Sequence, residues 1–255
     1  MISPETDRAM ARFFISPEAW NLDALVLDAD ESHHCLHVLR CKPGDRVTVF
    51  NGAGAEASAE VDTLSPAGVT LRTISSQKPP GAQVPIALAQ AIPKGKNMEL
   101  IVQKATELGV SAIFPLVSER TIVRLHPDDG RRKRLKWQRV AVEACKQSGQ
   151  NWLPAVAAPA GVEDFLRQPV LREFEARFVA SLEPEARSLK AFLADSPAPP
   201  RSALVFIGPE GDFTPAEMNS IRGADIQPLG LGPIVLRTET AALHALSILA
   251  YELRG

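Results

Sequence analysis

Cysteine is scarce in this sequence and long apolar runs are absent, and each absence excludes a class of protein. The 255 residues include three cysteines and no C-x-x-C pair, which fits neither a disulfide framework nor a thioredoxin-like site. No uninterrupted apolar run reaches the length of a transmembrane helix, about eighteen residues. The N-terminal residues also lack the apolar stretch of a secretory signal. We therefore expect a soluble, cytoplasmic protein with no membrane partner.

The composition is that of an ordinary folded protein, but its charge is unevenly spread. Hydrophobic residues make up 45% and charged residues 23% of the chain, which excludes a disordered, collagen-like or coiled-coil protein. The formal net charge is −2. Residues 81–154 hold 12 basic and 6 acidic residues, whereas the segments on either side each have an acidic excess of four. A basic middle between acidic flanks indicates an anionic partner.

Turn-forming residues at 75–81, Ser-Ser-Gln-Lys-Pro-Pro-Gly, divide the chain into two regions. Before them, alternating apolar and polar residues predict three short strands, at 47–50, 57–61 and 69–73. The pair Asn51-Gly52 indicates a hairpin, and one helical stretch lies near 32–40. The sequence therefore predicts a small β-rich domain in residues 1–78.

Strands and helices alternate in the rest of the chain. Apolar runs predict strands at 86–92, 110–117, 177–182 and 203–207. Helical periodicity predicts helices at 98–108, 131–146, 185–194 and 238–253. This alternation is typical of a mainly parallel sheet covered by helices on both faces. We expect it to form a second domain, residues 79–255.

The first candidate ligand loop, Gly208–Phe213, lies between an apolar strand candidate and a predicted helix. Thr214 is a favourable N-cap, and Glu217 three residues later completes a capping box. In open α/β sheets ligands bind at such junctions, because loops and helix N-termini converge there. A plain strand-to-helix turn explains this loop equally well.

The second candidate ligand loop, Leu229–Leu236, carries Gly230 and Gly232 and leads into a helix that begins at Thr238 or Thr240. Its spacing matches neither a dinucleotide-binding G-x-G-x-x-G nor a phosphate-binding P-loop. An apolar loop with accessible backbone suits a flat, uncharged group such as adenine. Two such loops close together in the sequence indicate a binding site more strongly than either does alone.

Further motifs accompany the two loops. They are Pro93–Glu99, Lys104–Val110, Glu143–Gly149, Arg12–Phe14 and His33–Arg40. Together with the loops, they closely resemble the RsmE family, the uridine-N3 methyltransferases of bacterial 16S ribosomal RNA within the SPOUT class, and the resemblance runs the whole chain. The sequence departs from the family pattern at Asp212, where a second glycine is usual, and at Gln150, where we expect arginine.

The resemblance implies a fold, a reaction and partners. The implied fold class is α/β, with a C-terminal parallel-sheet SPOUT domain that carries a trefoil knot and a small N-terminal PUA-like β-barrel domain that binds RNA. Such a knot is an exception to the rule that chains do not thread loops. The implied reaction is methylation of N3 of a specific uridine, with S-adenosylmethionine as methyl donor. The implied partners are 16S ribosomal RNA within the small ribosomal subunit and a second copy of the chain.

The motifs also imply site residues. We expect the cofactor to be bound by residues of the two loops and their neighbours: Leu182, Gly208, Pro209, Glu210, Gly211, Leu229, Gly230, Leu231, Gly232, Ile234, Leu236, Thr240 and Ala241. We expect RNA to be bound by residues of both domains: Arg12, His33, Arg40, Lys94, Lys96, Arg120, Arg131, Arg132 and Arg134.

The segment 131–139 contains six basic residues in nine. It fits a solvated helix face, or a phosphate-binding surface whose affinity depends on salt because counterions are released. The basic bias of the whole region favours RNA. We interpret Trp137, within this segment, as a packing residue.

The histidines and cysteines do not predict a metal site. His33, His37 and Cys41 would share one face of a continuous helix, but Pro43 makes it doubtful that a helix reaches Cys41, and no fourth donor is present. We therefore expect no metal. His244, among apolar residues of the last predicted helix, is interpreted as a core or dimer-interface residue rather than a catalytic base.

Methylation at N3 of uracil requires loss of the N3 proton, so a base or an anion-stabilising cation is useful. Arg237 and Glu239 follow the second loop and are the best catalytic candidates on sequence. Arg237 would stabilise charge on a uracil oxygen or grip a phosphate, and Glu239 would accept the proton. Equally, Glu239 would simply complement the helix N-terminus. Two rival functions are a ribose 2′-O-methyltransferase of the same knotted class and a non-catalytic RNA-binding protein.

Overall fold

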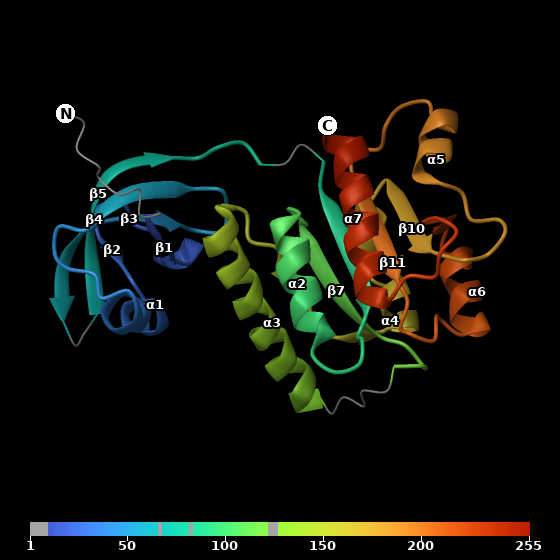
Figure 1. The fold of residues 1–255 in the computed structure, drawn as a ribbon, viewed down its shortest axis with the longest axis horizontal. Coiled ribbons are helices and arrows are strands. Elements are labelled where there is room, and N and C mark those ends of the chain that lie inside the picture. Colours follow the sequence, from blue (N-terminus) through green and yellow to red (C-terminus); the bar gives the residue numbers. More distant parts are fainter. Residues whose placement is uncertain (1–9, 66–67, 82–83, 122–126) are drawn as a thin grey trace. The chain divides into compact units, whose positions relative to one another are not determined.

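The computed structural model describes residues 10–65, 68–81, 84–121 and 127–255 (Figure 1). The chain folds into two compact units. The first comprises Met1–Gly81 with Cys145–Leu153, and the second comprises Ala82–Ala144 with Pro154–Gly255. The segment Cys145–Leu153 therefore belongs to the first unit although it comes from the middle of the chain, which the sequence did not indicate. The domain boundary after residue 78 stays a prediction.

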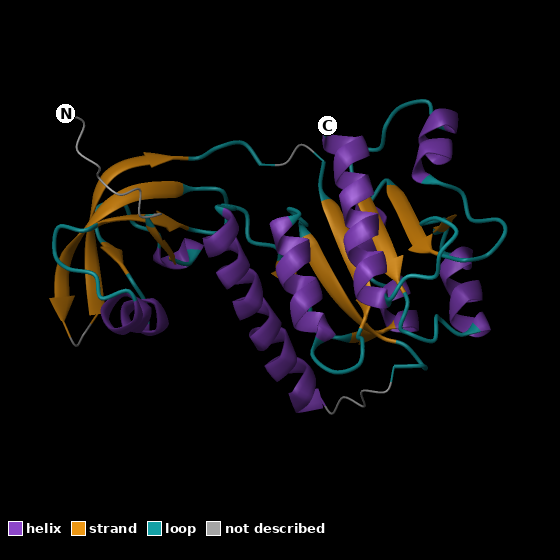
Figure 2. Cartoon of the chain, in the orientation of Figure 1, coloured by secondary structure: helices purple, strands orange, loops and turns teal. Residues whose placement is uncertain are grey.

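A curled five-stranded sheet forms the first unit (Figure 2). Its strands, in the spatial order β1-β3-β4-β5-β2, are β1 (Ala11–Phe14), β2 (Leu25–Val26), β3 (Arg46–Phe50), β4 (Glu56–Ser65) and β5 (Gly68–Gln77). All neighbours are antiparallel except β1 and β3, which are parallel. The helical segments beside it are Pro17–Ala19, α1 (Ala29–His33) and the π-helical turn His34–Val38. The expected small β-rich region is confirmed.

Period-two alternation buries one set of side chains in this sheet. The buried residues include Phe13, Leu25, Val47, Val49, Ala59 and Leu71. Five residues join β3 to β4. Within this loop, Asn51 Oδ1 accepts the N–H groups of Ala53 (2.9 Å) and Ala55 (3.0 Å). The hairpin predicted from Asn51-Gly52 is therefore confirmed, and its loop is longer than a two-residue turn.

The second unit contains a wholly parallel sheet of seven strands. The order is β12-β10-β11-β6-β7-β8, with β9 also pairing with β7, and the strands are β6 (Ile86–Ala91), β7 (Ala112–Val117), β8 (Ala155–Val156), β9 (Ala160–Gly161), β10 (Ala176–Ala180), β11 (Ala203–Ile207) and β12 (Gln227–Leu229). The helices are α2 (Asn97–Glu107), α3 (Pro127–Ser148), α4 (Val162–Leu166), the 3-10 helix Pro169–Glu173, α5 (Leu189–Asp195), α6 (Pro215–Gly223) and α7 (Thr238–Arg254). The predicted parallel sheet is confirmed.

Both faces of this sheet are covered, which explains why its central strands are almost continuously apolar. On one face, Leu204 and Phe206 of β11 pack with Phe165 of α4 and Ile221 of α6. Helix α7 packs over β6 and β11 and against α2 (Figure 1). Among the described residues, no helix is long and apolar enough to cross a bilayer.

Two expectations about helices of the second unit are wrong. The helix expected over 185–194 begins only at Leu189, because the hydroxyl of Ser188 accepts the N–H of Ala191 (3.2 Å) and caps it there. His244 is exposed rather than in the core, because the helical period turns it away from the buried stripe of α7. Trp137 is 3% exposed, which confirms its interpretation as a packing residue.

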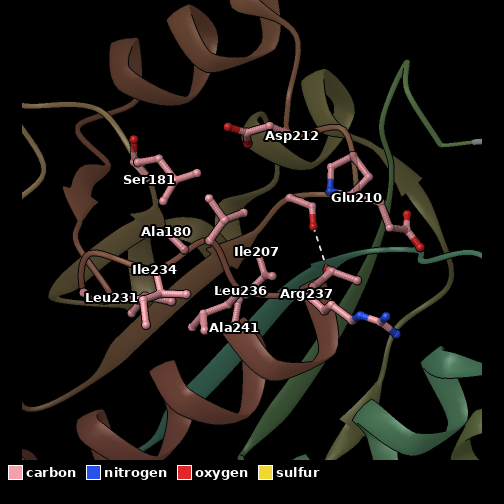
Figure 3. Close-up of a pocket in the computed structure, with 16 residues that line it drawn as sticks. Ala180, Ser181, Ile207, Glu210, Asp212, Leu231, Ile234, Leu236, Arg237 and Ala241 are labelled. Atoms are coloured by element: carbon pink, nitrogen blue, oxygen red, sulfur yellow. Dashed lines mark hydrogen bonds between the residues drawn. The ribbon is translucent and has the colours of Figure 1, made fainter.

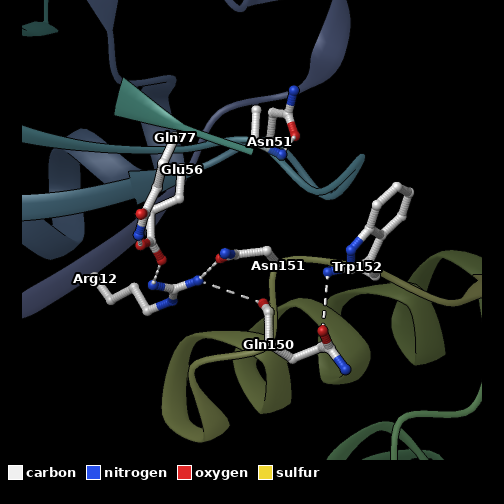
Figure 4. A network of polar contacts seen from close by, with 8 residues as sticks. Arg12, Asn51, Glu56, Gln77, Gln150, Asn151 and Trp152 are labelled. Carbon is white, nitrogen blue, oxygen red and sulfur yellow. Dashed lines mark hydrogen bonds and ion pairs between the residues drawn. The ribbon is translucent and has the colours of Figure 1, made fainter. Parts of the chain in front are cut away.

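Arg12 is the centre of a polar network within the first unit (Figure 4). Its guanidinium donates to Glu56 Oε2 (2.8 Å), to the carbonyl of Gln150 (3.5 Å) and to Asn151 Oδ1. It also lies 4.6 Å from the centre of the Phe50 ring. The side chains of Arg12 and Glu56 are 12% and 20% exposed. Because burial excludes most of the water around them, each of these charges depends on the other.

The neighbours of Glu56 keep its carboxyl ionised. Burial alone would raise the pKa of Glu56, but hydrogen bonds from Arg12 and Gln77 lower it below its usual value. Gln77 Nε2 lies 2.8 Å from the second carboxylate oxygen. A carboxyl with a lowered pKa stabilises the fold above the pKa of the unfolded chain, and this contribution is lost as the pH falls through the folded-state pKa.

We expect Glu56→Gln to lower the free energy of unfolding by about 2 kcal/mol at pH 7, since Arg12 keeps its charge but loses its ionic partner. The difference from the parent should close as the pH falls below about 4, where the parent carboxyl also becomes neutral. Glu60→Gln on the same strand is the control, because its partner Arg72 is 62% exposed. Chemical denaturation at several pH values measures both, and equal losses would contradict the role given to Arg12.

Candidate functional site

The first candidate ligand loop joins β11 to α6 and has a fixed shape. Thr214 and Glu217 form the predicted capping box, which is confirmed. Asp212 has a φ of 60°, the left-handed conformation that favours glycine, and its Oδ1 accepts the N–H of Phe213 (2.8 Å). A Cβ at Gly208 would lie 2.9 Å from that same oxygen. Glycine at 208 is therefore what lets the Asp212 side chain fold back over the loop.

The second candidate ligand loop joins β12 to α7. Gly232 has a φ of 113°, and a Cβ there would meet no atom within 4 Å. The residue is thus required for its backbone conformation and leaves open space beside it. Gly230 is held from its other side, where its N–H donates to the carbonyl of Arg187 (2.9 Å). Ile234 and Val235 are 71% and 73% exposed.

A cavity of about 310 Å³, which we call the main pocket, lies between the two loops (Figure 3). It is lined by Ala180, Ser181, Leu182, Ile207, Gly208, Pro209, Glu210, Asp212, Leu231, Gly232, Ile234, Val235, Leu236, Arg237, Thr238 and Ala241. Figure 3 shows Leu231, Ile234 and Ala241 on one side and the side chains of Glu210 and Arg237 on the other. The main pocket lies at the carboxyl ends of β10 and β11, where α/β sheets bind ligands.

A buried chain of hydrogen bonds fixes the floor of the main pocket. The hydroxyl of Thr238, the first residue of α7, donates to the carbonyl of Gly208 (2.7 Å). It also accepts from Nε2 of Gln90, a fully buried residue of β6 (3.0 Å). Thr238 therefore joins the start of α7 to the start of the first loop, and Gln90 joins both to the central strand.

Two neighbouring segments support the first loop from outside. The backbone N–H of Lys94 donates to Glu210 Oε1 (2.8 Å), and the Arg120 guanidinium donates to the carbonyl of Gly211. The structure thus places two of the predicted RNA-binding residues, Lys94 and Arg120, beside the main pocket. Their basic side chains are exposed there, where an anionic substrate would approach.

Most of the residues predicted to bind the cofactor come together in the main pocket. Those that line it are Leu182, Gly208, Pro209, Glu210, Leu231, Gly232, Ile234, Leu236 and Ala241, whereas Gly211, Leu229, Gly230 and Thr240 do not. Of the two catalytic candidates, Arg237 lines the pocket, and Glu239 lies in the first turn of α7 outside its lining. Their roles stay predictions.

Sequence reasoning missed several pocket residues. They are Ala180, Ser181, Ile207, Val235 and the hydrogen-bonded Thr238, together with Gln90 beneath them. Gln90 carried a usable signal, because it is a single amide side chain in an otherwise apolar run of residues 86–92. A polar residue in a buried strand needs a partner, and such partners commonly mark a site.

The remaining residues predicted to bind RNA are spread over both units. Arg12 is engaged by Glu56, as described above. His33 and Arg40 are exposed at the two ends of the π-helical turn, and Lys96 is exposed before α2. On α3, Arg131 is exposed, Arg132 pairs with Asp129 (2.6 Å), and Arg134 Nε donates to the carbonyl of Val156 (3.1 Å). No common surface can be assigned to these residues, so their contacts with RNA stay predictions.

The histidine cluster has the geometry of a helix end. The π-helical turn ends at Val38, before Cys41, while the His33 and His37 rings lie 4.7 Å apart. Within the described residues, no three histidine, cysteine or acidic side chains are grouped so as to hold a metal ion.

Comparison with known families agrees with the fold and the main pocket. A family model described as an RNA methyltransferase domain matches residues 80–250, and one described as an RNA methyltransferase PUA domain matches residues 27–74. A parallel-sheet unit with a ligand pocket at its carboxyl edge, preceded by such a domain, defines an RNA methyltransferase.

Individual relatives narrow this class. Ribosomal RNA small subunit methyltransferase E of Bacillus subtilis is 32% identical over 256 residues, which cover 96% of this chain and 99% of that protein. The chain belongs to the ribosomal RNA small subunit methyltransferase E family, and the resemblance found from the motifs is confirmed.

Two solved structures resemble the whole chain. A putative methyltransferase from Legionella pneumophila, in complex with the bound cofactor SAM, is 32% identical with a TM-score of 0.86. Ribosomal RNA small subunit methyltransferase E from Neisseria gonorrhoeae, bound to S-adenosyl methionine, is 30% identical with a TM-score of 0.82. Each similarity covers 95% of this chain and 98% of the other.

We expect Thr238→Val to destabilise the protein, because it keeps the side-chain shape but leaves the Gly208 carbonyl and the Gln90 amide without their shared partner. The free energy of unfolding should fall by about 1–3 kcal/mol. Thr240→Val, two residues further along α7 where the side chain is exposed, is the matched control and should cost less than about 0.5 kcal/mol. Denaturant titration of both variants checks this, and equal losses would show that the buried hydroxyl does not matter.

Proposed function

We propose that this protein transfers a methyl group from S-adenosylmethionine to N3 of a specific uridine in 16S ribosomal RNA of the small ribosomal subunit. The observation that carries the proposal is the main pocket, whose two loops lie at the carboxyl ends of β10, β11 and β12. Membership of the family and the S-adenosylmethionine bound to relatives of the same fold support it.

The residues of the main pocket fit this cofactor. Leu231, Ile234 and Ala241 offer an apolar wall suited to the adenine ring. The carboxylates of Glu210 and Asp212 favour a ligand with a positive charge and hydroxyl donors, which the amino acid and ribose parts carry. The open space beside Gly232 lets the backbone approach closely. When bound, the cofactor supplies a methyl group on a positively charged sulfur.

Arg237 is the residue placed to act on the uracil. It lines the main pocket and lies on the side opposite the apolar wall (Figure 3). Negative charge develops on the uracil oxygens as N3 loses its proton, and a guanidinium held there stabilises that charge in the transition state. Glu239, just inside α7, is the second candidate. It either accepts the N3 proton or stabilises the helix N-terminus.

The two domains divide the work in this proposal. Residues 1–78 form a PUA-like β-barrel that binds RNA, and residues 79–255 form the SPOUT methyltransferase domain with its trefoil knot. The family-model match over residues 27–74 supports the first assignment. The exposure of Ile234 and Val235 beside the main pocket supports a homodimer, because exposed apolar patches commonly mark interfaces. A cytoplasmic location and the absence of a metal belong to the same proposal.

Two alternatives are separated by one experiment. Small ribosomal subunits from cells lacking the activity are incubated with the protein and labelled S-adenosylmethionine, and the modified nucleotide is identified by mass spectrometry. We expect label on the base at N3 of one uridine, and none with Gly232→Val, which fills the open space in the loop. Label on a ribose would identify a 2′-O-methyltransferase, and no transfer to any RNA would leave a non-catalytic RNA-binding protein.

Substitution of the catalytic candidates gives a sharper prediction. Arg237→Lys should lower kcat about a hundredfold, because a point charge does not reproduce the planar donor fork. If Glu239 is the base, Glu239→Gln should cause a similar loss that shrinks as the pH rises and hydroxide replaces it. Steady-state kinetics across pH, with calorimetric binding of S-adenosylmethionine as control, measure both. Near-parental turnover in both variants would move the chemistry elsewhere.

The basic surface of α3 makes a separate prediction. Replacing Arg131, Arg132 and Arg134 with alanine should weaken RNA binding and flatten its salt dependence, because each lost phosphate contact releases fewer counterions. The matched control replaces three arginines outside α3 that are already ion-paired: Arg187, Arg201 and Arg222. RNA binding measured at several salt concentrations compares the two triple variants, and the same slope in both would make α3 a solvated helix face.

A further inference from the structure

A second cavity of the C-terminal unit lies at the opposite end of β10 from the main pocket. Its volume is about 390 Å³, within the range of small-molecule sites. It is lined by Leu166, Arg167, Gln168, Leu171, Arg172, Arg177, Ala224 and Asp225. We call it the arginine pocket, because it gathers three arginines from α4, the following 3-10 helix and the start of β10.

Arg177 is the innermost of these arginines. It occupies the second position of β10, and its Nε atom is buried without a hydrogen-bond partner among the described residues. Buried donors in folded proteins are nearly always satisfied by protein, water or ligand. The unpaired Nε therefore indicates that a further acceptor completes this site.

The other charges of the arginine pocket leave a positive excess. Arg172 is exposed and has no ion-pair partner among the described residues. Arg167 pairs with Asp164 (3.2 Å), but both side chains are more than two-thirds exposed, and exposed pairs are weak. Asp225 is the one carboxylate in the lining. Three guanidinium groups against one carboxylate give a net charge of +2.

A phosphomonoester matches this excess. It carries a charge of about −2 at pH 7 and three strong acceptor oxygens, and guanidinium groups bind such oxygens in pairs. The cavity is larger than a phosphate group requires, and Leu166, Leu171 and Ala224 add apolar surface. That surface suits a ribose or a base attached to the phosphate.

We propose that the arginine pocket is a second ligand site that binds a nucleotide through its terminal phosphate. The nucleotide is either free or the 5′-phosphorylated end of an RNA strand, because both present the same group. The site is separate from the main pocket, and the inference does not rest on the proposed methyl transfer.

Adenosine 5′-monophosphate is the probe, and its binding to the full chain is followed by calorimetry. We expect saturable binding, competition by inorganic phosphate, and no binding of adenosine. Arg172→Gln should weaken binding about tenfold or more. Arg201→Gln is the matched control, since it removes the same charge from an exposed arginine of the same unit outside the pocket. Binding should also weaken below about pH 6, where the phosphate gains its second proton.

Several outcomes decide the matter. Equal weakening by Arg172→Gln and Arg201→Gln, or no saturable binding at all, overturns the proposal. Binding that Gly232→Val abolishes and Arg172→Gln spares also overturns it, because the probe then occupies the main pocket. A 5′-phosphorylated oligonucleotide that binds more tightly than both the mononucleotide and its 5′-hydroxyl form supports the site with RNA as its ligand. Equal affinity for oligonucleotide and mononucleotide supports the site with a free nucleotide.

Discussion

The hydroxyl of Thr238 is the contact on which the main pocket depends. It receives a hydrogen bond from Gln90 and gives one to the carbonyl of Gly208, so that a central strand, the first loop and the last helix share one buried atom. Because this atom lies in the low-dielectric interior, its bonds are stronger than they would be in water and costly to lose. The two loops keep their separation because their inner ends are fixed at the same point.

The parallel sheet decides where chemistry takes place in the C-terminal unit. Parallel strands bring all their carboxyl ends to one edge, so loops more than twenty residues apart in the chain become neighbours. The first loop presents acidic side chains and the second presents apolar ones. A pocket with one polar and one apolar wall then orients an amphipathic ligand without any charged residue in the strands themselves.

Local signals predicted much of this architecture, and long-range ones were missed. The capping box at Thr214 and the strand–helix alternation could be predicted because they depend on residues a few positions apart. The late start of α5 depends on one hydroxyl, that of Ser188, which competes with a good helical pattern upstream. The partners of Gln90 and the surroundings of Arg177 come from segments up to 148 positions away, and no periodicity encodes such pairings.

The segment Cys145–Leu153 has a consequence for how this protein is made. Gln150 and Asn151 hold the Arg12 guanidinium, and the ring of Trp152 lies where a Cβ at Gly54 would be only 2.3 Å away. On the ribosome, residues up to Gly81 emerge well before this segment does. The N-terminal unit therefore waits, with Arg12 partly unpaired, until most of α3 has been synthesised, so its folding follows the order of synthesis only in part.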